Sequence, residues 1–493
     1  MRNLIFQKPE VSVAVDVTGS LSYGWQHIRI PVIVPLLSIA IHLCVGMSIM
    51  LFVERVYMAI VIICVKLLGK KRYTKYKLDD LKEDLERNKS YPLVLIQIPM
   101  YNEKEKKEAK PLLPPNTAVD HSGAAIKNKV YKLSIGSACA LSWPSDRLIV
   151  QVLDDSTNKV LRALVELECQ KWVEKGVNVK YETRNNRNGY KAGALRDGLQ
   201  KQYVQECEFV AIFDADFQPD KDFLWRAIPY LLENPELGLV QARWKFVNAD
   251  ECLMTRLQEM SLDYHFSVEQ EVGSSMYSFF GFNGTAGVWR IQAVNDAGGW
   301  KDRTTVEDMD LAVRASLKGM LCKETKAIPL LSYYAEGVNL EEISLSVLVP
   351  EVHLPKPIAI YLPATITILN AVCTPRSMHL LVFWILFENV MSLHRSKAAV
   401  IGLLEANRVN EWVVTEKLGN TSKQKCNAKI SKKPQSRIGE RIHVLELIMG
   451  MFMLHCAIYN LLFGKDHFFV YLLLQAGAFF IIGFGHVGTF VPN

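Results

Sequence analysis

The stretch Phe209–Asp220, FVAIFDADFQPD, decides the fold class of this 493-residue chain. It opens with the apolar run Phe209–Phe213, which has the length and composition of a buried strand. Asp214 and Asp216 follow, and residues two apart lie on the same side of an extended backbone. Mg²⁺ and Mn²⁺ prefer a few carboxylate oxygens together with substrate phosphates as ligands. The stretch therefore predicts a strand of an α/β domain that ends in a metal site.

The sequence around this stretch alternates between strand and helix patterns. Short runs rich in Val and Ile predict strands, and longer amphipathic runs predict helices between them. This alternation indicates a mostly parallel sheet with helices on both faces, over residues 91–335. Besides Phe209–Phe213, the expected strands are Leu93–Ile98, Leu148–Leu153 and Val177–Tyr181, and the expected helices are Lys132–Leu141, Lys159–Val173 and Lys191–Gln202.

A second strand also ends in acidic residues. Leu148–Leu153 runs directly into Asp154 and Asp155, in QVLDDST. One acidic strand end can simply be a solvated terminus. Two of them in a parallel sheet meet at the same edge, where such sheets bind their ligands.

A third acidic pair, Glu307 and Asp308, lies in TTVEDMDLAVRASLKG. Thr304 or Thr305 can cap a helix that begins near Val306, and the helix dipole favours acids in its first turn. That interpretation explains both acids without any chemistry. The alternative makes Asp308 a general base that takes a proton from an acceptor hydroxyl. Both interpretations remain open from the residues alone.

Two glycine-containing loops complete the candidate site. Asn186–Leu195, NRNGYKAGAL, places Lys191 and glycines before a helix, which suits contact with a diphosphate. Phe279–Arg290, FFGFNGTAGVWR, is aromatic and glycine-rich, which suits the flat face of a sugar ring. Each loop by itself is also compatible with ordinary turn chemistry.

Apolar runs at both ends of the chain predict membrane segments. Pro31–Val53 carries no formal charge, and about 20 apolar residues cross a bilayer core. The next run, Val56–Leu68, is too short to span alone and either extends the first helix or lies along the interface.

The predicted organisation of the whole chain begins with a polar segment (1–30), a transmembrane or interfacial helix (31–68) and a basic linker (69–90). The α/β domain (91–335) follows, with a flexible insertion (104–129). The C-terminal membrane region (336–493) has spans around 359–391, 444–463 and 468–484 and a polar loop (395–441).

Composition excludes some function classes. The net charge of +6 comes from scattered Lys and Arg, so we expect no nucleic-acid partner. The ten cysteines include no Cys-x-x-Cys pair, which predicts reduced, buried thiols rather than a disulfide framework or a zinc site.

At these motifs the chain resembles the processive family-two glycosyltransferases, which include the cellulose, chitin and hyaluronan synthases. The segments IPMYNE, QVLDDST, NRNGYKAGAL, FDADFQPD, FNGTAGVWR and TVEDMDLAVRA carry the resemblance in this order and spacing. Val240–Ser275 and Thr374–Ala398 resemble one subgroup in particular, the plant cellulose-synthase-like A proteins, or glucomannan 4-β-mannosyltransferases.

The resemblance implies a GT-A-type catalytic domain with inverting, processive chemistry and α-helical transmembrane segments. It implies GDP-mannose as the donor, with GDP-glucose as a second donor, and a β-1,4-mannan or glucomannan chain as the acceptor. It also implies Mn²⁺ or Mg²⁺ as the metal ion. The expected location is the Golgi membrane, which the chain crosses several times in contact with lipid, and a homo-oligomer stays open. Carried over by position, the catalytic residues are Asp308 and Asp155, the donor-binding residues are Asp154, Asp155, Lys191 and Asp214, the metal ligands are Asp214 and Asp216, and the acceptor-binding residues are Phe282, Asn283, Gly284, Thr285 and Glu307.

The chain departs from the family pattern in two places. The family carries a Gln-x-x-Arg-Trp motif after the catalytic acids, and this sequence has none there; Gln241–Trp244 is one residue short and precedes Asp308. The segment 104–129 is an insertion where the family joins directly. Three alternatives therefore stay open: an inactive isoform, a non-catalytic membrane partner, and a synthase that makes another β-glycan from a UDP-sugar. A dolichol-phosphate mannose synthase would share the domain but would not need the C-terminal spans.

Overall fold

The computed structural model describes residues 27–68, 78–102, 130–184, 186–247, 249, 253–274, 281–302, 306–318, 361–371, 375–391, 443–463 and 468–484. Several expectations fall outside these ranges. They are the insertion 104–129, the polar loop 395–441, the capping residues Thr304 and Thr305, and the stretch after Gly319 where the Gln-x-x-Arg-Trp motif would stand.

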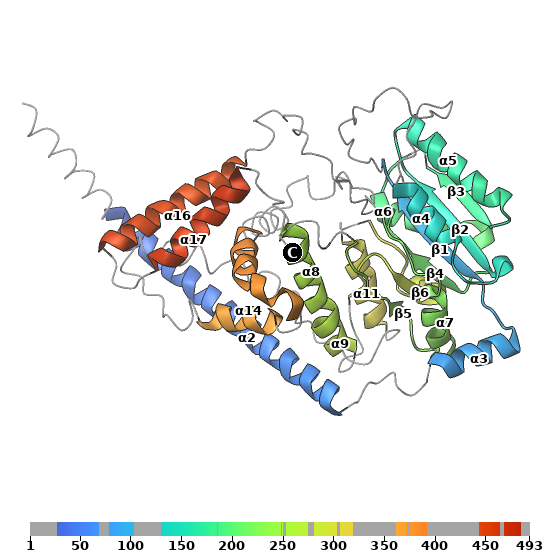
Figure 1. Ribbon diagram of the computed structural model, residues 1–493, viewed down its shortest axis with the longest axis horizontal. Coiled ribbons are helices and arrows are strands. Elements are labelled where there is room, and N and C mark those ends of the chain that lie inside the picture. The colour runs from blue at the N-terminus through green and yellow to red at the C-terminus, as the bar shows by residue number, and fades with distance from the viewer. Residues whose placement is uncertain are drawn as a thin grey trace, which may run out of the picture.

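A six-stranded sheet forms the centre of the α/β domain, in the order β3-β2-β1-β4-β6-β5 (Figure 1). The strands β1 to β4 pair in parallel, and β6 pairs antiparallel with both β4 and β5. The predicted mostly parallel sheet is therefore confirmed. The strand bounds are β1 Val94–Met100, β2 Leu148–Asp154, β3 Val179–Thr183, β4 Phe209–Ile212, β5 Leu239–Gln241 and β6 Gly287–Arg290.

Helices cover both faces of the sheet, as predicted. Side chains alternate between the faces of a strand, and central strands buried on both faces are apolar at every position. Ile96 and Ile98 of β1 accordingly pack in one core with α4, α5 and α7, and Leu95 packs in a second core with α6, α10 and α11. The helix bounds are α4 Val130–Cys139, α5 Lys159–Glu174, α6 Tyr190–Leu199, α7 Phe223–Glu233, α10 Ile291–Asp296 and α11 Glu307–Leu317.

The antiparallel edge of the sheet differs from the sequence interpretation. The segment Phe279–Arg290 was expected to be a loop, but its last four residues form β6 between β4 and β5. These residues are too few to show an alternating pattern. Their strand conformation depends on hydrogen bonds from two partners, which no local sequence signal reports.

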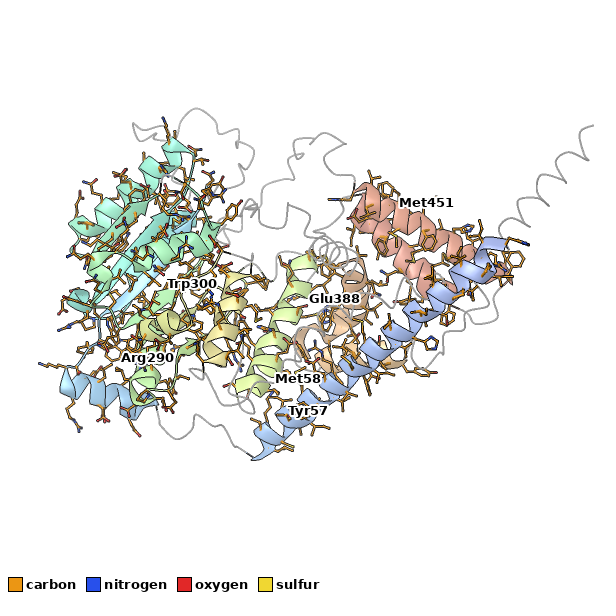
Figure 2. The ribbon with its side chains drawn as sticks, turned by 180° about the vertical axis from the view of Figure 1, so that it is seen from behind. Tyr57, Met58, Arg290, Trp300, Glu388 and Met451 are labelled. Atoms are coloured by element: carbon orange, nitrogen blue, oxygen red, sulfur yellow. The ribbon has the colours of Figure 1, made fainter. Side chains whose placement is uncertain are left out.

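The N-terminal apolar region is one continuous helix. The helix α2, Val34–Leu68, has 35 residues, so the run Val56–Leu68 extends the first segment and is not a separate interfacial helix. A helix of this length is about 52 Å long, and a hydrocarbon core is about 30 Å thick. Its last turns therefore have length to spare beyond a bilayer. They pack against the helical stretch made of α8 (Leu253–Tyr264), the π-helical turn His265–Glu269 and α9 (Gln270–Val272) (Figures 1 and 2).

Among the described residues, two helices are long and apolar enough to cross a membrane: Arg29–Leu67 and Val444–Phe463 (α16). The helix α17, Phe469–Gly483, has 15 residues and packs along α16. The expected span around 359–391 is described as two helical pieces, α14 (Leu362–Ala371) and Met378–Met391. Both are shorter than the about 20 residues of a full crossing, so the three C-terminal spans remain predictions.

Candidate active site

The carboxyl edge of the parallel strands brings the predicted acidic residues to one side of the sheet. Asp154 ends β2 and Asp214 follows β4, with β1 paired between these two strands. Parallel strands all end at the same edge, which is why two acidic pairs 60 residues apart in sequence become neighbours here.

Asp154 is fully buried and holds the turn after β2. Its Oδ1 accepts a hydrogen bond from the Ser156 amide at 2.8 Å, and its Oδ2 accepts one from the Tyr181 hydroxyl at 2.9 Å. Burial and the Asp154 charge raise the pKa of Tyr181, so the phenol remains a donor at physiological pH. Both carboxylate oxygens thus have partners inside the domain.

Asp155 forms a two-point ion pair with Arg184. The Arg184 Nε lies 2.9 Å from Asp155 Oδ1, and its Nη2 contacts Asp155 Oδ2. The same guanidinium donates to the carbonyls of Asn188 and Tyr190, each at 3.0 Å. Arg184 therefore ties the acidic turn after β2 to the loop that precedes Lys191. The sequence interpretation missed Arg184, although its position directly after the third strand was a signal for it.

Lys191 is buried at the start of α6 among acidic groups. Its Nζ lies 2.7 Å from Asp214 Oδ1 and 3.8 Å from Glu307 Oε1. It also donates to the Gly284 carbonyl at 3.0 Å. Burial would lower the pKa of Lys191, but the charges of Asp214 and Glu307 outweigh it and raise the pKa to about 12. The lysine is thus a fixed positive charge among the predicted metal-site and acceptor-site acids.

Asp308 lies in the first turn of α11, against the same face of Gly284 as Lys191. Gly284 has φ +73°, and a Cβ at this position would stand 2.9 Å from Asp308 Oδ2 and 3.2 Å from Lys191 Nζ. Asp308 Oδ1 also accepts from the Met309 amide at 2.8 Å, which is the local role that its first-turn position predicted. Burial raises the pKa of Asp308, and the Lys191 charge only partly opposes this.

The loop 281–286, which we call the acceptor loop, connects these groups. Thr285 Oγ1 accepts from the Asp214 amide at 3.0 Å. Gln241 braces the loop from β5, because its Oε1 accepts from the Asn283 amide at 3.3 Å and its Nε2 donates to the Thr285 carbonyl at 2.9 Å. The sequence interpretation did not assign this role to Gln241. Phe282 is 1% exposed and packs edge-on against Trp289, so its ring presents no open face here.

Asp214 and Asp216 fit a hard divalent cation by the chemistry of their donor atoms. Asp214 is half-buried and Asp216 is exposed, on either side of the buried Ala215. The described ranges contain no group of three or more His, Cys, Asp or Glu side chains that could hold a metal ion. A cation at this pair would therefore draw further oxygen ligands from a substrate phosphate, as Mg²⁺ commonly does.

The mostly parallel sheet with helices on both faces has the GT-A-type architecture of a glycosyltransferase. In agreement, the family model for glycosyl transferase family group 2 matches residues 209–326. Glucomannan 4-beta-mannosyltransferase 1 of Cyamopsis tetragonoloba is 64% identical to this chain, and the alignment covers 100% of both. Glucomannan 4-beta-mannosyltransferase 9 of Arabidopsis thaliana is 54% identical over 97% of this chain and 96% of its own length. The chain belongs to the glucomannan 4-beta-mannosyltransferase family.

The alignment with the Cyamopsis protein extends over 551 positions, whereas this chain has 493 residues. The relative therefore carries sequence that this chain lacks. Among solved structures, the mannosyltransferase PcManGT from Pyrobaculum calidifontis, in complex with GDP-Man and Mn2+, is 16% identical with a TM-score of 0.34, covering 74% of this chain and 91% of that chain. A likeness at this level supports no conclusion about ligands.

Proposed function

We propose that this chain transfers mannose, and secondarily glucose, from a GDP-sugar to a growing β-1,4-mannan or glucomannan chain. The observation that carries the proposal is the full-length 64% identity to a glucomannan 4-beta-mannosyltransferase. The approach of Lys191 and Asp308 to the same face of Gly284 supports it, because a donor-side cation and a base belong close to one reaction centre.

On the donor side, Asp154 and Asp155 shape the turn after β2 that holds the nucleotide, Asp154 from inside the domain, and Arg184 holds Asp155 in place. Lys191 binds an oxygen of the diphosphate, for which a buried ammonium is well suited. Asp214 and Asp216 would hold Mn²⁺ or Mg²⁺, which when bound neutralises charge on the leaving diphosphate. Support for this assignment is the position of the four aspartates at the carboxyl edge of the sheet, with Lys191 beside them.

On the acceptor side, Asp308 takes the proton from the attacking sugar hydroxyl. A single displacement at an α-linked donor gives a β-linked product, so one base is sufficient for inverting chemistry. Burial raises the pKa of Asp308, and a base whose pKa is nearer to neutral accepts a proton more readily. Glu307 and the acceptor loop, with Asn283, Gly284 and Thr285, orient the sugar.

The membrane setting belongs to the proposal as well. The two candidate spanning helices, Arg29–Leu67 and Val444–Phe463, support a membrane protein. We extend this to a multi-pass protein of the Golgi membrane in contact with lipid.

One observation favours a second candidate, a non-catalytic or inactive form. The chain has no Gln-x-x-Arg-Trp motif, and it is shorter than its alignment with the Cyamopsis relative. In this form the chain would keep its fold and bind nucleotide-sugar or a sister subunit without forming polymer.

The test is incorporation of labelled mannose from GDP-mannose into insoluble, β-mannanase-sensitive polymer by membranes that express this chain with Mn²⁺ or Mg²⁺. Asp308→Asn should abolish the product, and the matched control Asp222→Asn, an exposed residue paired with Arg226, should not. Polymer from UDP-glucose instead would identify the other β-glycan synthase. Polymer only after the missing stretch is restored would establish the inactive form.

A further inference from the structure

A chain of polar side chains connects α2 to the acceptor loop, and the proposed chemistry does not use its members Arg55, Glu269 and His265. Arg55 of α2 pairs with Glu269, with 2.6 Å between Nη1 and Oε1. The other oxygen of Glu269 lies 2.7 Å from His265 Nδ1. His265 Nε2 in turn lies 3.1 Å from Asn283 Oδ1 in the acceptor loop.

This polar chain lies beside an apolar contact between α2 and the segment that carries His265 and Glu269. Met58 and Val61 of α2 pack with Val268 and Val272 in one cluster of buried side chains (Figure 2). The Arg55 side chain is 7% exposed and stacks over the Tyr264 ring, 4.9 Å from its centroid. The helix α2 and the segment that carries His265 therefore meet in a packed interface, and Glu269 cannot reorient freely.

The surroundings of His265 favour its protonated form. Each ring nitrogen faces an oxygen acceptor, Glu269 at Nδ1 and Asn283 at Nε2, and only the imidazolium donates to both. The Gln270 amide nitrogen also lies 3.3 Å from His265 Nε2, but the Asn283 oxygen is nearer, at 3.1 Å. Of the charged groups packed around it, Glu269 on its own segment favours the proton and Arg55 of α2 opposes it. Burial would lower the pKa of His265, but the hydrogen bond and charge of Glu269 outweigh it and raise the pKa above its ordinary value of 6.5.

Asn283 is the residue through which this polar chain reaches the reaction centre. It immediately precedes Gly284, which accepts a hydrogen bond from Lys191 and packs against Asp308. Gln270 reinforces the contact, because its amide nitrogen lies 3.2 Å from Asn283 Oδ1 and 3.3 Å from the Gly281 carbonyl. A shift of Asn283 therefore moves the loop backbone against which the lysine and the base both lie.

We propose that protonated His265 is a positioning residue: it holds the acceptor loop against Lys191 and Asp308, and Arg55 and Glu269 anchor it to α2. The effect of His265 on catalysis rests on the proposed function, whereas its effect on the position of the acceptor loop does not. When pH rises through the pKa of His265, the ring keeps one hydrogen and can donate to one of its two acceptors. The acceptor loop then loses a charge-assisted hydrogen bond and loosens.

The first measurement is hydrogen exchange of the full chain in lipid nanodiscs, read by mass spectrometry over residues 281–286 as a function of pH. After correction for intrinsic exchange, loop protection should fall about tenfold above the pKa of His265, as loss of a charged hydrogen bond implies. His265→Gln keeps one donor without a charge, so its loop should be loose at every pH. Glu269→Gln removes the carboxylate that favours the proton, so the loss of protection should move to lower pH. The matched control is His379→Gln, an exposed histidine outside this polar chain.

The outcomes separate the proposal from its foundation. The positioning role would be overturned if exchange protection of the acceptor loop did not depend on pH in the wild type. It would also be overturned if this protection were the same in His265→Gln and Glu269→Gln as in the wild type. If His265→Gln does not accumulate, the pH shift of Glu269→Gln decides alone. In the polymer assay, loosening should raise the KM for the acceptor more than it lowers kcat, and the basic limb of the pH profile should move with Glu269→Gln. Absence of polymer from the wild type would count against the proposed function and leave the exchange result standing.

Discussion

At the scale of single residues, Gly284 shows how closely the candidate site is packed. Its backbone has φ +73°, and Asp308 and Lys191 both crowd the position that a Cβ would take, so there is no room for a side chain. We expect Gly284→Ala to destabilise the chain by about 1 kcal/mol through backbone strain, and to lower polymer synthesis about a hundredfold, because misplacement by about 1 Å is that costly. Melting temperature and mannose incorporation measure the two effects.

Gly299 provides the matched control for this prediction. It has φ +68° and no heavy atom within 4 Å of an added Cβ, so Gly299→Ala carries the backbone strain without the collision. A similar loss of activity in both variants would show that strain, and not contact with Lys191 and Asp308, is responsible.

Arg184 is the second residue whose geometry leads to a prediction. Its guanidinium group forms two hydrogen bonds to the Asp155 carboxylate and donates to two loop carbonyls, an arrangement that the single ammonium group of a lysine cannot reproduce. Arg184→Lys should lower the free energy of unfolding by about 2 kcal/mol, the value of charged hydrogen bonds in partly buried sites. It should also weaken GDP-sugar binding, measured by titration calorimetry. Arg226→Lys, at an exposed pair, should change neither quantity.

Glu269 gives a prediction about stability and pH. Burial would raise the pKa of Glu269, but the hydrogen bond from His265 and the charge of Arg55 outweigh it and lower the pKa to about 2, from 4.5. Because the folded pKa lies below the unfolded one, this carboxylate stabilises the chain above pH 4.5 and loses that contribution as the pH falls toward 2. The melting temperature of wild type should exceed that of Glu269→Gln at about pH 6, and the difference should shrink near about pH 3. A constant difference would contradict the pairing.

At the scale of elements, the cap of α5 is a local feature that stabilises the donor side. The Asn158 side chain accepts from the amides of Val160 and Leu161 at 3.0 and 3.3 Å. Asn158→Ala should therefore cost about 1 kcal/mol, and Asn158→Asp should cost much less because it keeps the acceptor. Thermal unfolding of the two variants tests this, and equal losses would mean that the cap is not the cause.

Element prediction from sequence succeeded where periodicity and length were sufficient. The central strands and the helices α4, α5 and α11 lie within a few residues of their expected bounds. It failed at β6, which is four residues long and exists because β4 and β5 bond to it on both sides. It also left two alternatives for Val56–Leu68, and the structure shows that this run is part of α2 and packs against the segment of α8 and α9.

At the scale of the whole molecule, ligand binding should stabilise the chain as a unit. A ligand at about a hundred times its Kd adds about 2.7 kcal/mol to the folded state. GDP-mannose with Mn²⁺ should thus raise the melting temperature, and excess chelator should remove most of the shift. Asp216→Asn should reduce the shift, while Asp222→Asn should keep it. An equal shift in chelator would show that donor binding does not depend on a metal at Asp214 and Asp216.

The sequence by itself determined the class of fold, the acidic strand ends, the lysine and base candidates and the apolar helices. These features are local, because each consists of a run of apolar residues, two acidic residues two positions apart, or a short motif that can be recognised without knowing the rest of the structure. Tertiary structure decided which of these residues lie together. The order of parallel strands brings Asp154 and Asp214 to one edge, and the packing of α11 and the acceptor loop brings Asp308 and Lys191 to the same face of Gly284. Contacts such as Arg184 with Asp155, Gln241 with the acceptor loop and His265 with Asn283 join side chains from different elements. Nothing in the spacing of those residues along the chain encodes a distance between them, so only the packed structure reveals their roles.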